Sequence, residues 1–331
     1  MLFSALCGVE KYSTLTVIGS RSSARLVRAV LDAVDDRIAE AADIQLIGFR
    51  LDARLWRRIL ARFEFVELEA CRLGRGWWLK SEAAMRCVHL GLSRCSGVVP
   101  RAIRAGQAGW SGLSSISVCE WFNVERFSPM PSIPEFERPP EPSTNEFTRA
   151  LVGALWSSNL KELCLSRCGS LEWLTELPPA SGLEIISLSY CAASEAVFHW
   201  VLRHLALRSL SLCWKKGSRF PWAKIRGLRR LRGLDLSDTF LEDSELAEIA
   251  QNSKLGSIMV FYTAISAQSW STLLRWRSLK QVWASTELMN GQMPADLPSE
   301  TGLDEVVALN AKLEPFEKFL ERYPSVKLVQ M

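Results

Sequence analysis

The run LKELCLSRC at residues 160–168 is the clearest copy of the pattern that decides the fold. Its apolar residues fall at the first, fourth and sixth positions. Five further runs repeat this order: LEIISLSYC from 183, LRSLSLCWK from 207, LRGLDLSDT from 231, LGSIMVFYT from 255 and LKQVWASTE from 279. Their last apolar anchors are 23 or 24 residues apart: Leu165, Leu188, Leu212, Leu236, Val260 and Ala284. A fixed period of this length indicates a repeat architecture.

These runs resemble the leucine-rich repeat family, whose pattern is L-x-x-L-x-L-x-x-N/C-x-L at a period of about 20 to 29 residues. The resemblance covers residues 160–284 well and the rest of the chain loosely. It implies an α/β fold, a right-handed leucine-rich-repeat solenoid (horseshoe) with parallel β-strands on the concave face and helices on the convex face. The cysteine-containing subtype is indicated, because Cys71, Cys95, Cys168 and Cys191 occupy the N/C position. We expect these side chains to turn inward and bond the backbone of a neighbouring repeat.

The register continues on both sides of the six runs. Downstream it reaches Ala308, and a terminal strand is expected around Val326 and Leu328. Upstream, weaker anchors with uneven spacing follow one another at Val17, Leu46, Leu68, Leu92 and Val118. Longer helices are expected at 22–41 and 52–63, and the first would close the open end of the core.

Three regions follow from this register. Residues 1–127 form an N-terminal cap with degenerate repeats, 128–144 a proline-rich loop or insertion, and 145–331 the regular repeat array with a C-terminal cap. The middle stretch, SPMPSIPEFERPPEPST, holds six prolines in seventeen residues, which excludes a helix or a ladder strand. Two interpretations stay open for it: a linker or irregular repeat, or a docking segment in polyproline conformation that uses Ile133 and Phe136.

Composition is that of a soluble globular protein. The 331 residues are 48% hydrophobic and 23% charged, with a net charge of +4, and no run of about 18 uncharged apolar residues occurs that could cross a membrane. The apolar start lacks a basic region and ends early at Glu10 and Lys11, which argues against a signal peptide. Nine cysteines without tight paired spacing favour a reducing, cytoplasmic location.

The residues that carry catalysis or bind metals are sparse. The three histidines are His89, His199 and His204, and the last two are five residues apart, about 140° around a helix, so they could not share a metal ion. No nucleophile, phosphate-binding or zinc motif occurs in the chain. Asp235 and Asp238 lie together at the end of a strand, but solvated side chains or contact with a basic partner explain them more simply than acid–base catalysis. The sequence therefore predicts a non-enzymatic protein with no cofactor, no metal ion and no catalytic residues.

Large side chains accumulate at the positions that should face outward from the strands. By the two-residue period of strands, the concave face presents aromatic residues, one methionine and an acidic pair. Such a set is typical of a protein-binding hot spot, although rings packed against one another in a curved solenoid would also explain it. The predicted partner-binding residues are Tyr190, Trp214, Asp235, Asp238, Met259, Phe261, Tyr262 and Trp283. The family resemblance implies a scaffold that recognises another protein, as an inhibitor or immunity-type protein or as an adaptor.

An alternative function is association with nucleic acid or a ribonucleoprotein through basic surfaces. Residues 151–232 hold 12 basic and 5 acidic side chains, whereas residues 233–331 hold 8 and 14. The residues that would serve this function are Arg21, Arg25, Arg28, Arg54, Arg57 and Arg58, together with the run from Lys215 to Arg232. Binding of this kind would weaken steeply with salt and would not depend on the concave aromatic residues.

Overall fold

The chain divides into two compact units, Met1–Glu162 and Leu163–Met331, which we call unit 1 and unit 2. The computed structural model describes residues 14–18, 27, 43–75, 77, 86–97, 112–119, 142–213, 220–252, 254–285, 288, 294, 296–309 and 319–330. The expected helix at 22–41 therefore lies outside the described residues except for Val27, which is helical and buried. Residues 128–141 of the proline-rich stretch also lie outside them, so the three predicted regions stay a prediction.

Unit 1 contains a parallel sheet whose strands pair in the order in which they occur in the chain. The strands are β1 (Thr14–Ile18), β2 (Asp43–Ile47), β4 (Phe65–Glu69), β6 (His89–Ser93) and β8 (Ser115–Cys119). Their register places the five predicted anchors side by side, in the series Val17, Leu46, Leu68, Leu92 and Val118. The uneven spacing of the upstream anchors therefore reflects connecting segments of different length, while the strands themselves keep one register.

An outer layer covers this sheet. It consists of α2 (Ala53–Arg62), α3 (Pro142–Leu155) and a small parallel sheet of β3 (Arg50–Leu51), β5 (Arg72–Leu73) and β7 (Ser96–Gly97). The Asp52 side chain accepts a hydrogen bond from Leu55 N at 2.8 Å and so caps α2, whose buried face includes Trp56. The predicted helix at 52–63 is confirmed. Helix α3 begins at Pro142, so the last three residues of the proline-rich stretch are helical, which proline permits in a first turn.

Unit 2 repeats one strand and one outer segment. Its strands are β9 (Glu162–Ser166), β10 (Ile185–Ser189), β11 (Ser209–Ser211), β12 (Gly233–Asp235), β13 (Ser257–Val260), β14 (Gln281–Ser285), β15 (Glu305–Leu309) and β16 (Lys327–Gln330). From β10 to β16 all pairs are parallel. The partners Ser209, Gly233, Ser257, Gln281 and Glu305 follow one another at intervals of 24 residues.

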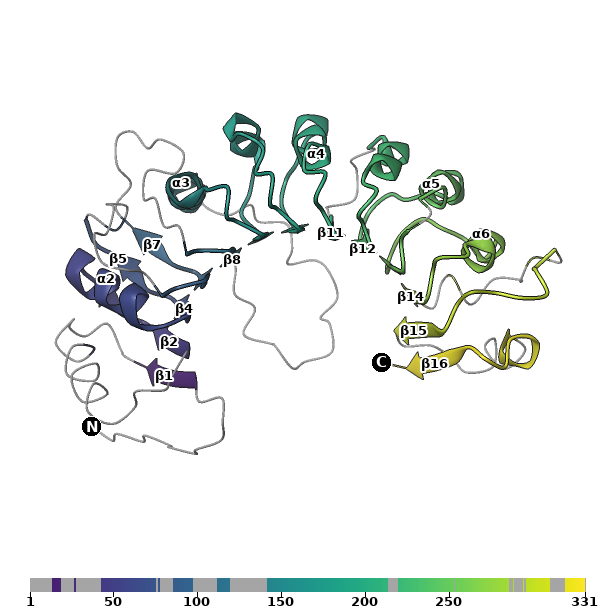
Figure 1. Cartoon of the computed structure of the whole chain (residues 1–331), viewed down its shortest axis with the longest axis horizontal. Helices are drawn as coiled ribbons and strands as arrows, with labels where there is room; N and C mark the ends of the chain where they lie inside the picture. Colours follow the sequence, from purple (N-terminus) through teal and green to yellow (C-terminus); the bar gives the residue numbers. More distant parts are fainter. Residues whose placement is uncertain are drawn as a thin grey trace. The chain divides into compact units, whose positions relative to one another are not determined.

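Helical segments lie on one side of these strands, as Figure 1 shows for α4, α5 and α6. They are η2 (Glu172–Glu176), α4 (Glu195–Leu202), η3 (Trp222–Gly227), α5 (Asp243–Ile249) and α6 (Ser269–Arg275). Side chains tie each segment to the next, since Glu172 accepts from Ser194 Oγ at 2.8 Å and Asp243 accepts from Ser266 Oγ at 2.7 Å. The predicted α/β solenoid is confirmed.

The predicted cysteine ladder is confirmed at three of its four cysteines, and the thiol of the fourth, Cys168, donates to Ser166 O of its own repeat at 3.3 Å. The thiols of Cys71, Cys95 and Cys191 each donate to the carbonyl oxygen of an anchor one repeat earlier, those of Leu46, Leu68 and Leu165, at 3.3, 3.4 and 3.6 Å. Thr239 and Thr263 occupy the same position but bond differently. Their hydroxyls donate to Leu236 O and Val260 O of their own repeat, at 2.6 and 3.1 Å. These three thiols thus link neighbouring repeats, whereas the two threonine hydroxyls bond within their own repeat.

Buried tryptophans make a second set of links between repeats. The indole N–H of Trp200 donates to Leu177 O at 3.2 Å, that of Trp270 to Leu288 O at 3.1 Å, and that of Trp276 to Asn252 O at 3.0 Å. A buried indole N–H needs such a partner. Each of these large rings thus fills the core and also satisfies a loop carbonyl of a neighbouring repeat.

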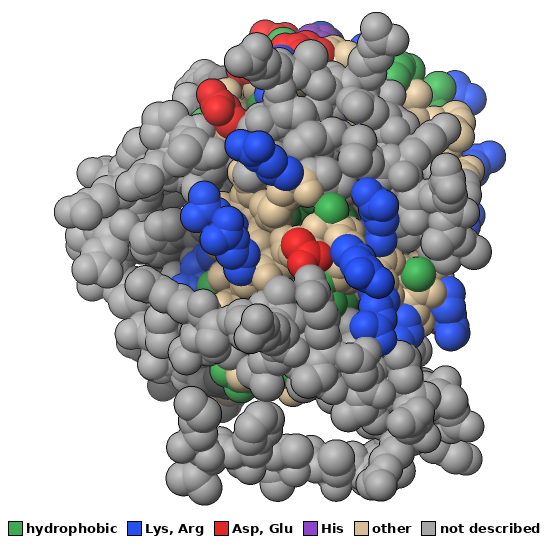
Figure 2. Space-filling view, turned by 90° about the vertical axis from the view of Figure 1, so that its left-hand side faces the viewer, with side chains coloured by type: hydrophobic (Ala, Val, Ile, Leu, Met, Phe, Trp, Pro, Cys, Tyr) green, Lys and Arg blue, Asp and Glu red, His purple; other side chains and the backbone are tan. Residues whose placement is uncertain are grey.

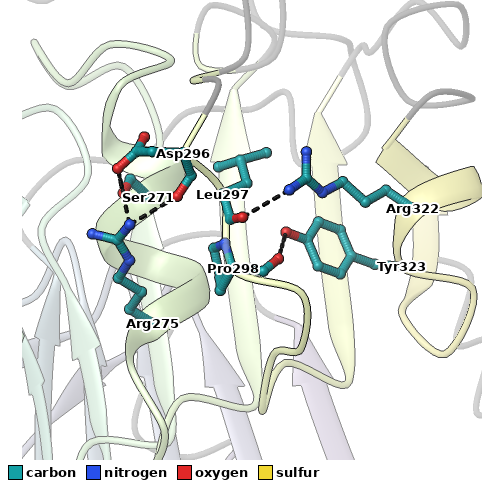
Figure 3. A network of polar contacts seen from close by, with 7 residues as sticks. All are labelled: Ser271, Arg275, Asp296, Leu297, Pro298, Arg322 and Tyr323. Carbon is teal, nitrogen blue, oxygen red and sulfur yellow. Dashed lines mark hydrogen bonds and ion pairs between the residues drawn. The ribbon is translucent and has the colours of Figure 1, made fainter.

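A polar network holds the segment Asp296, Leu297 and Pro298 between two neighbouring elements (Figure 3). From α6, Arg275 Nη2 donates to the carbonyl oxygen of Asp296 at 2.8 Å and to its carboxylate at 2.9 Å. From the C-terminal side, Arg322 Nη2 donates to Leu297 O at 2.7 Å, and the Tyr323 hydroxyl donates to Pro298 O at 2.6 Å. These bonds hold residues 296–298 against α6 on one side and against residues 322 and 323 on the other.

The part of the chain that the structure describes contains no helix that is both long enough and apolar enough to cross a membrane.

Replacing one anchor by a charged residue should unfold the array. Leu212 and Leu236 are both fully buried, so Leu212→Asp or Leu236→Asp would place an unpaired carboxylate in a continuous core and cost more than about 4 kcal/mol. Thermal unfolding followed by circular dichroism measures this loss. Ser209→Asp, at a half-buried outward position of β11, is the matched control and should melt close to wild type. Near-wild-type melting of both anchor variants would contradict the register.

Candidate binding face

Several residues at or just beyond the ends of strands have an unusual backbone conformation. In unit 2, Arg167, Tyr190, Asp238 and Tyr262 have φ values between 53° and 60°, in the left-handed region that favours glycine. The cause is a backbone hydrogen bond to the next repeat. Tyr190 N donates to Cys213 O at 2.6 Å, and Asp238 N donates to Phe261 O at 2.8 Å. Each of these bonds turns the chain near the end of its strand and fixes the backbone that carries side chain 190 or 238.

Register brings outward residues of successive strands into one row. The row comprises Ser187, Ser211, Asp235, Met259 and Trp283, each the lateral partner of the next, and it ends at Val307, which is buried. Side chains at lateral partners in neighbouring strands contact one another. We call the row, together with the residues that follow each strand from β10 to β14, the strand face. On it, Met259 lies between Asp235 and Trp283, and all three are half-buried.

Asp235 is committed to internal hydrogen bonds. Its Oδ1 accepts from Ser237 N at 3.0 Å and Ser237 Oγ at 2.7 Å, while its Oδ2 accepts from Ser211 Oγ at 3.0 Å and Cys213 Sγ at 2.9 Å. Four donors satisfy the carboxylate, so it acts first as a brace between β11 and β12. Burial, and then the negative charge of Asp235, raise the pKa of the Cys213 thiol to about 12.

Asp238 makes a different contact from Asp235. It accepts a hydrogen bond from the Tyr190 hydroxyl at 3.2 Å, across the intervening repeat. The guanidinium of Arg167 lies 5.2 Å from the centre of the Tyr190 ring, on its face, a cation–π distance. Burial of the ring, followed by the charge of Asp238, raises the pKa of the Tyr190 phenol. The two aspartates therefore serve separate contacts and do not form an acid–base pair.

The remaining large side chains lie at the ends of β13 and β14. Phe261 and Tyr262 follow β13, and Trp283 lies within β14, where its Cα is the partner of Met259. All four are half-buried, so each presents part of its apolar surface. Tyr262 N donates to Ser285 Oγ at 3.3 Å, which ties it to the next strand. The eighth predicted residue, Trp214, lies outside the described residues.

Unit 1 has a polar chain on its strands that the sequence reasoning missed. His89 Nε2 lies 2.9 Å from Glu67 Oε1, His89 Nδ1 lies 2.8 Å from Ser115 Oγ, and Ser115 Oγ donates to Glu162 Oε2 at 3.0 Å. Gly91 makes this chain possible, because a Cβ there would overlap the Glu67 carboxylate. The available signal was the common offset: His89, Ser115 and Glu162 each precede an anchor by three residues.

This chain has the residue types of a hydrolytic triad but not its direction of proton transfer. The Ser115 hydroxyl donates its hydrogen bond to Glu162. His89 Nδ1 therefore faces the Ser115 oxygen as a donor in this arrangement, and not as an acceptor. A general base has to accept the nucleophile's proton. Ser115 is also almost fully buried, at 7% exposure. The chain therefore links β4, β6, β8 and Glu162 at the start of β9.

The other two histidines are separated in the structure. His199 is exposed and lies 3.2 Å from Glu195 Oε1, whereas His204 is buried with Nδ1 3.0 Å from Trp200 O. Burial lowers the pKa of His204. Within the described residues, no group of three or more histidine, cysteine, aspartate or glutamate side chains could hold a metal ion.

The predicted basic residues are only partly described. Arg21, Arg25 and Arg28, like the start of the run at Lys215, lie outside the described residues. Arg54, Arg57 and Arg58 lie on α2 of unit 1, and Lys224 and Arg226 lie on η3 of unit 2. The structure thus places the two basic sets on different units.

Comparison with known proteins gives a limited result. No family model matches the chain, and no curated protein matches it. Among solved structures, an internalin (inlF) from Listeria monocytogenes matches with a TM-score of 0.49 and 14% identity, over 92% of this chain and 86% of that chain. Internalin C2 from the same organism matches with a TM-score of 0.38 and 13% identity, over 60% and 71%. These likenesses are too weak to argue from, and the solenoid assignment rests on the strand registers above.

Asp235 should matter for stability more than Asp238. Asp235→Ala leaves three side-chain donors and one backbone N–H without their acceptor, which should cost about 1 to 3 kcal/mol. Asp238→Ala removes the bond from the Tyr190 hydroxyl at a half-buried position and should cost less than Asp235→Ala does. Urea unfolding of the two variants and wild type measures the difference. Equal losses would show that Asp235 is not the brace described here.

The Cys213 thiol should resist alkylation in the folded protein. Because its pKa is raised to about 12, the thiolate that reacts is scarce at pH 8, and iodoacetamide should modify it at least about a hundredfold more slowly than in the unfolded chain. Above pH 9 the unfolded chain ionises this group and the folded protein does not, so stability should fall from about pH 9 towards pH 12. Asp235→Asn removes a charge that raises the pKa and should speed the reaction. Peptide mass spectrometry measures the rates, and fast native labelling would refute the assignment.

Proposed function

We propose that this chain is a leucine-rich-repeat protein that acts as a non-enzymatic scaffold and binds a partner protein on the strand face of unit 2. The cysteine ladder and the 24-residue interval of the partners from β11 to β15 support the family assignment. The residues proposed to contact the partner are Tyr190, Trp214, Asp235, Asp238, Met259, Phe261, Tyr262 and Trp283.

One observation carries the proposal. Met259, Phe261, Tyr262 and Trp283 are large, lie together over β13 and β14, and are all half-buried. Large apolar side chains that stay partly wet over neighbouring strands are typical of a binding surface, and tryptophan and tyrosine are enriched in hot spots. Within this surface, Asp235 acts mainly by fixing the strands, while Tyr190 and Asp238 form a polar rim.

The charge distribution favours a partner with a basic contact surface. Residues 233–331 carry 14 acidic and 8 basic side chains, and Asp238 lies beside the apolar cluster at the end of β12. Complementary charge accelerates association and selects among partners. If the strand face covers the partner's own active surface, the partner would be inhibited. If it binds another part of the partner, the partner would be recruited.

A reducing, cytoplasmic location belongs to the same proposal. Supporting it, the thiols of Cys71, Cys95 and Cys191 each donate to a backbone carbonyl inside the core. A disulfide at any of them would remove that donor. Disulfides are rare in the cytosol, so a ladder of thiols suits that compartment.

Removing the aromatic cluster should abolish partner binding. The triple variant Phe261→Ala, Tyr262→Ala, Trp283→Ala should weaken binding by at least about a hundredfold, because each truncated hot-spot residue costs about 1 to 2 kcal/mol or more. Affinity capture from the source cells with mass spectrometry would identify the partner. Titration of the purified pair by calorimetry, in 50 mM and 500 mM salt, would then measure the loss.

The control replaces an exposed apolar residue outside the strand face. Leu205 is 68% exposed and follows α4, and Leu205→Ala should leave binding unchanged. Thermal melting must show that the triple variant is folded. If the folded triple variant binds as tightly as wild type, the cluster is part of the architecture and the proposal fails.

A further inference from the structure

Arginines concentrate on the outer layer of unit 1. Residues 50–75 contain seven arginines and no lysine. Four of them, which we call the arginine face, are exposed: Arg50, Arg54, Arg72 and Arg75. Arg50 is the outward residue of β3, Arg72 that of β5, Arg54 lies in the first turn of α2, and Arg75 follows β5.

The backbone brings these four residues into one area. Arg50 and Arg72 are lateral partners in neighbouring parallel strands. Gly74 N donates to Leu51 O at 2.6 Å, and a Cβ on Gly74 would lie 3.4 Å from Asp52 Cα. Gly74 therefore holds Arg75 close to the start of α2, where Arg54 projects. Backbone contacts therefore fix the points from which the four arginine side chains extend.

The nearby carboxylates are engaged elsewhere. Glu64 pairs with Arg86 at 2.9 Å, Glu67 with His89 at 2.9 Å and Glu69 with Arg94 at 2.8 Å. Asp52 accepts from the backbone of α2. Among the described residues, none forms an ion pair with a member of the arginine face. Like charges directly opposite one another on neighbouring strands repel, so an anion bound here would relieve an unfavourable contact.

Figure 2 looks onto this end of the molecule and shows Lys and Arg side chains gathered around one Asp or Glu side chain. Phe65 is the one large apolar residue with an exposed side chain among residues 43–75, and it belongs to β4 of the other sheet. The arginine face thus offers charge without apolar anchors. That character does not suit insertion into a membrane surface, which requires apolar groups as well.

We propose that the arginine face binds the phosphate backbone of a nucleic acid. Guanidinium groups stay charged and bond phosphate oxygens in pairs, which lysine does not. Four exposed arginines spread over two strands and a helix match a chain of phosphates better than a single small anion. No described residue of the outer layer of unit 1 offers an exposed aromatic ring on which bases could stack, so the face contacts phosphates, independently of sequence and with strong dependence on salt. It lies in unit 1 and acts independently of the strand face of unit 2.

Fluorescence anisotropy with the full chain and a labelled 20-nucleotide single-stranded RNA of mixed sequence tests this proposal. The variant Arg50→Gln, Arg54→Gln, Arg72→Gln, Arg75→Gln should bind at least tenfold more weakly than wild type in 50 mM salt. Each phosphate neutralised on a single strand contributes about 0.7 to the slope of log K against log salt. The slope should therefore become shallower by about 3 in this variant.

A second quadruple variant removes the same charge from unit 2. Lys224→Gln, Arg226→Gln, Arg229→Gln, Arg230→Gln changes four exposed residues and should bind RNA as wild type does. Because no described residue forms an ion pair with the four arginines of the face, the first variant should melt no lower than wild type. The double variant Arg50→Gln, Arg72→Gln provides a milder change with an intermediate slope.

Four results would overturn the proposal. They are absence of RNA binding by wild type in 50 mM salt, equal losses in the two quadruple variants, equal binding to a peptide nucleic acid of the same sequence, and binding to phosphatidylserine vesicles without binding to RNA. The third result would assign recognition to bases, and the fourth would assign the face to a lipid surface.

Discussion

Lateral pairing of each strand with the strand of the next repeat is the constraint on which the rest of the molecule depends. In unit 2 equivalent residues stand side by side from β11 to β15. Parallel strands cannot turn directly into one another, so each pair requires a crossing segment on the outside. Two apolar anchors in or next to each strand from β9 to β14 then enter a continuous core, and a change of register by one residue would turn these residues outward.

The bond after each strand extends the same constraint to the surface. It holds Tyr190, Asp238 and Tyr262 in the left-handed region, at a conformational cost of about 1 to 2 kcal/mol each for residues other than glycine. The hydrogen bonds between neighbouring strands stabilise this turn and offset its conformational cost. As a result, the side chains that a partner would meet are fixed before binding, which lowers the entropy lost on association.

Charge is distributed by layer in unit 1. The glutamates of β4 are used in pairs with His89 and Arg94 on the strand side, whereas the outer layer carries arginines. In unit 2 the carboxylate Asp235 likewise serves the strands. Acidic groups on strands therefore brace neighbouring repeats, and the exposed arginines of the outer layer have no such role. This difference separates the surface proposed for nucleic acid from the surface proposed for protein.

The sequence by itself determined the strand positions, the anchors and the cysteine ladder, because a period of 24 residues with apolar residues at fixed offsets admits one parallel register. It also selected the outward residues of β12 to β14, since side chains alternate along a strand. Only the tertiary structure decided what each outward residue does. Asp235 and Asp238 look alike in sequence, yet the first accepts from two donors of its own repeat and two of the preceding repeat, whereas the Tyr190 phenol contacts the second. The chain from Glu67 to Glu162 and the proximity of Arg50 to Arg72 also depend on which strands become neighbours, and contacts between residues more than 20 positions apart arise only when the chain folds.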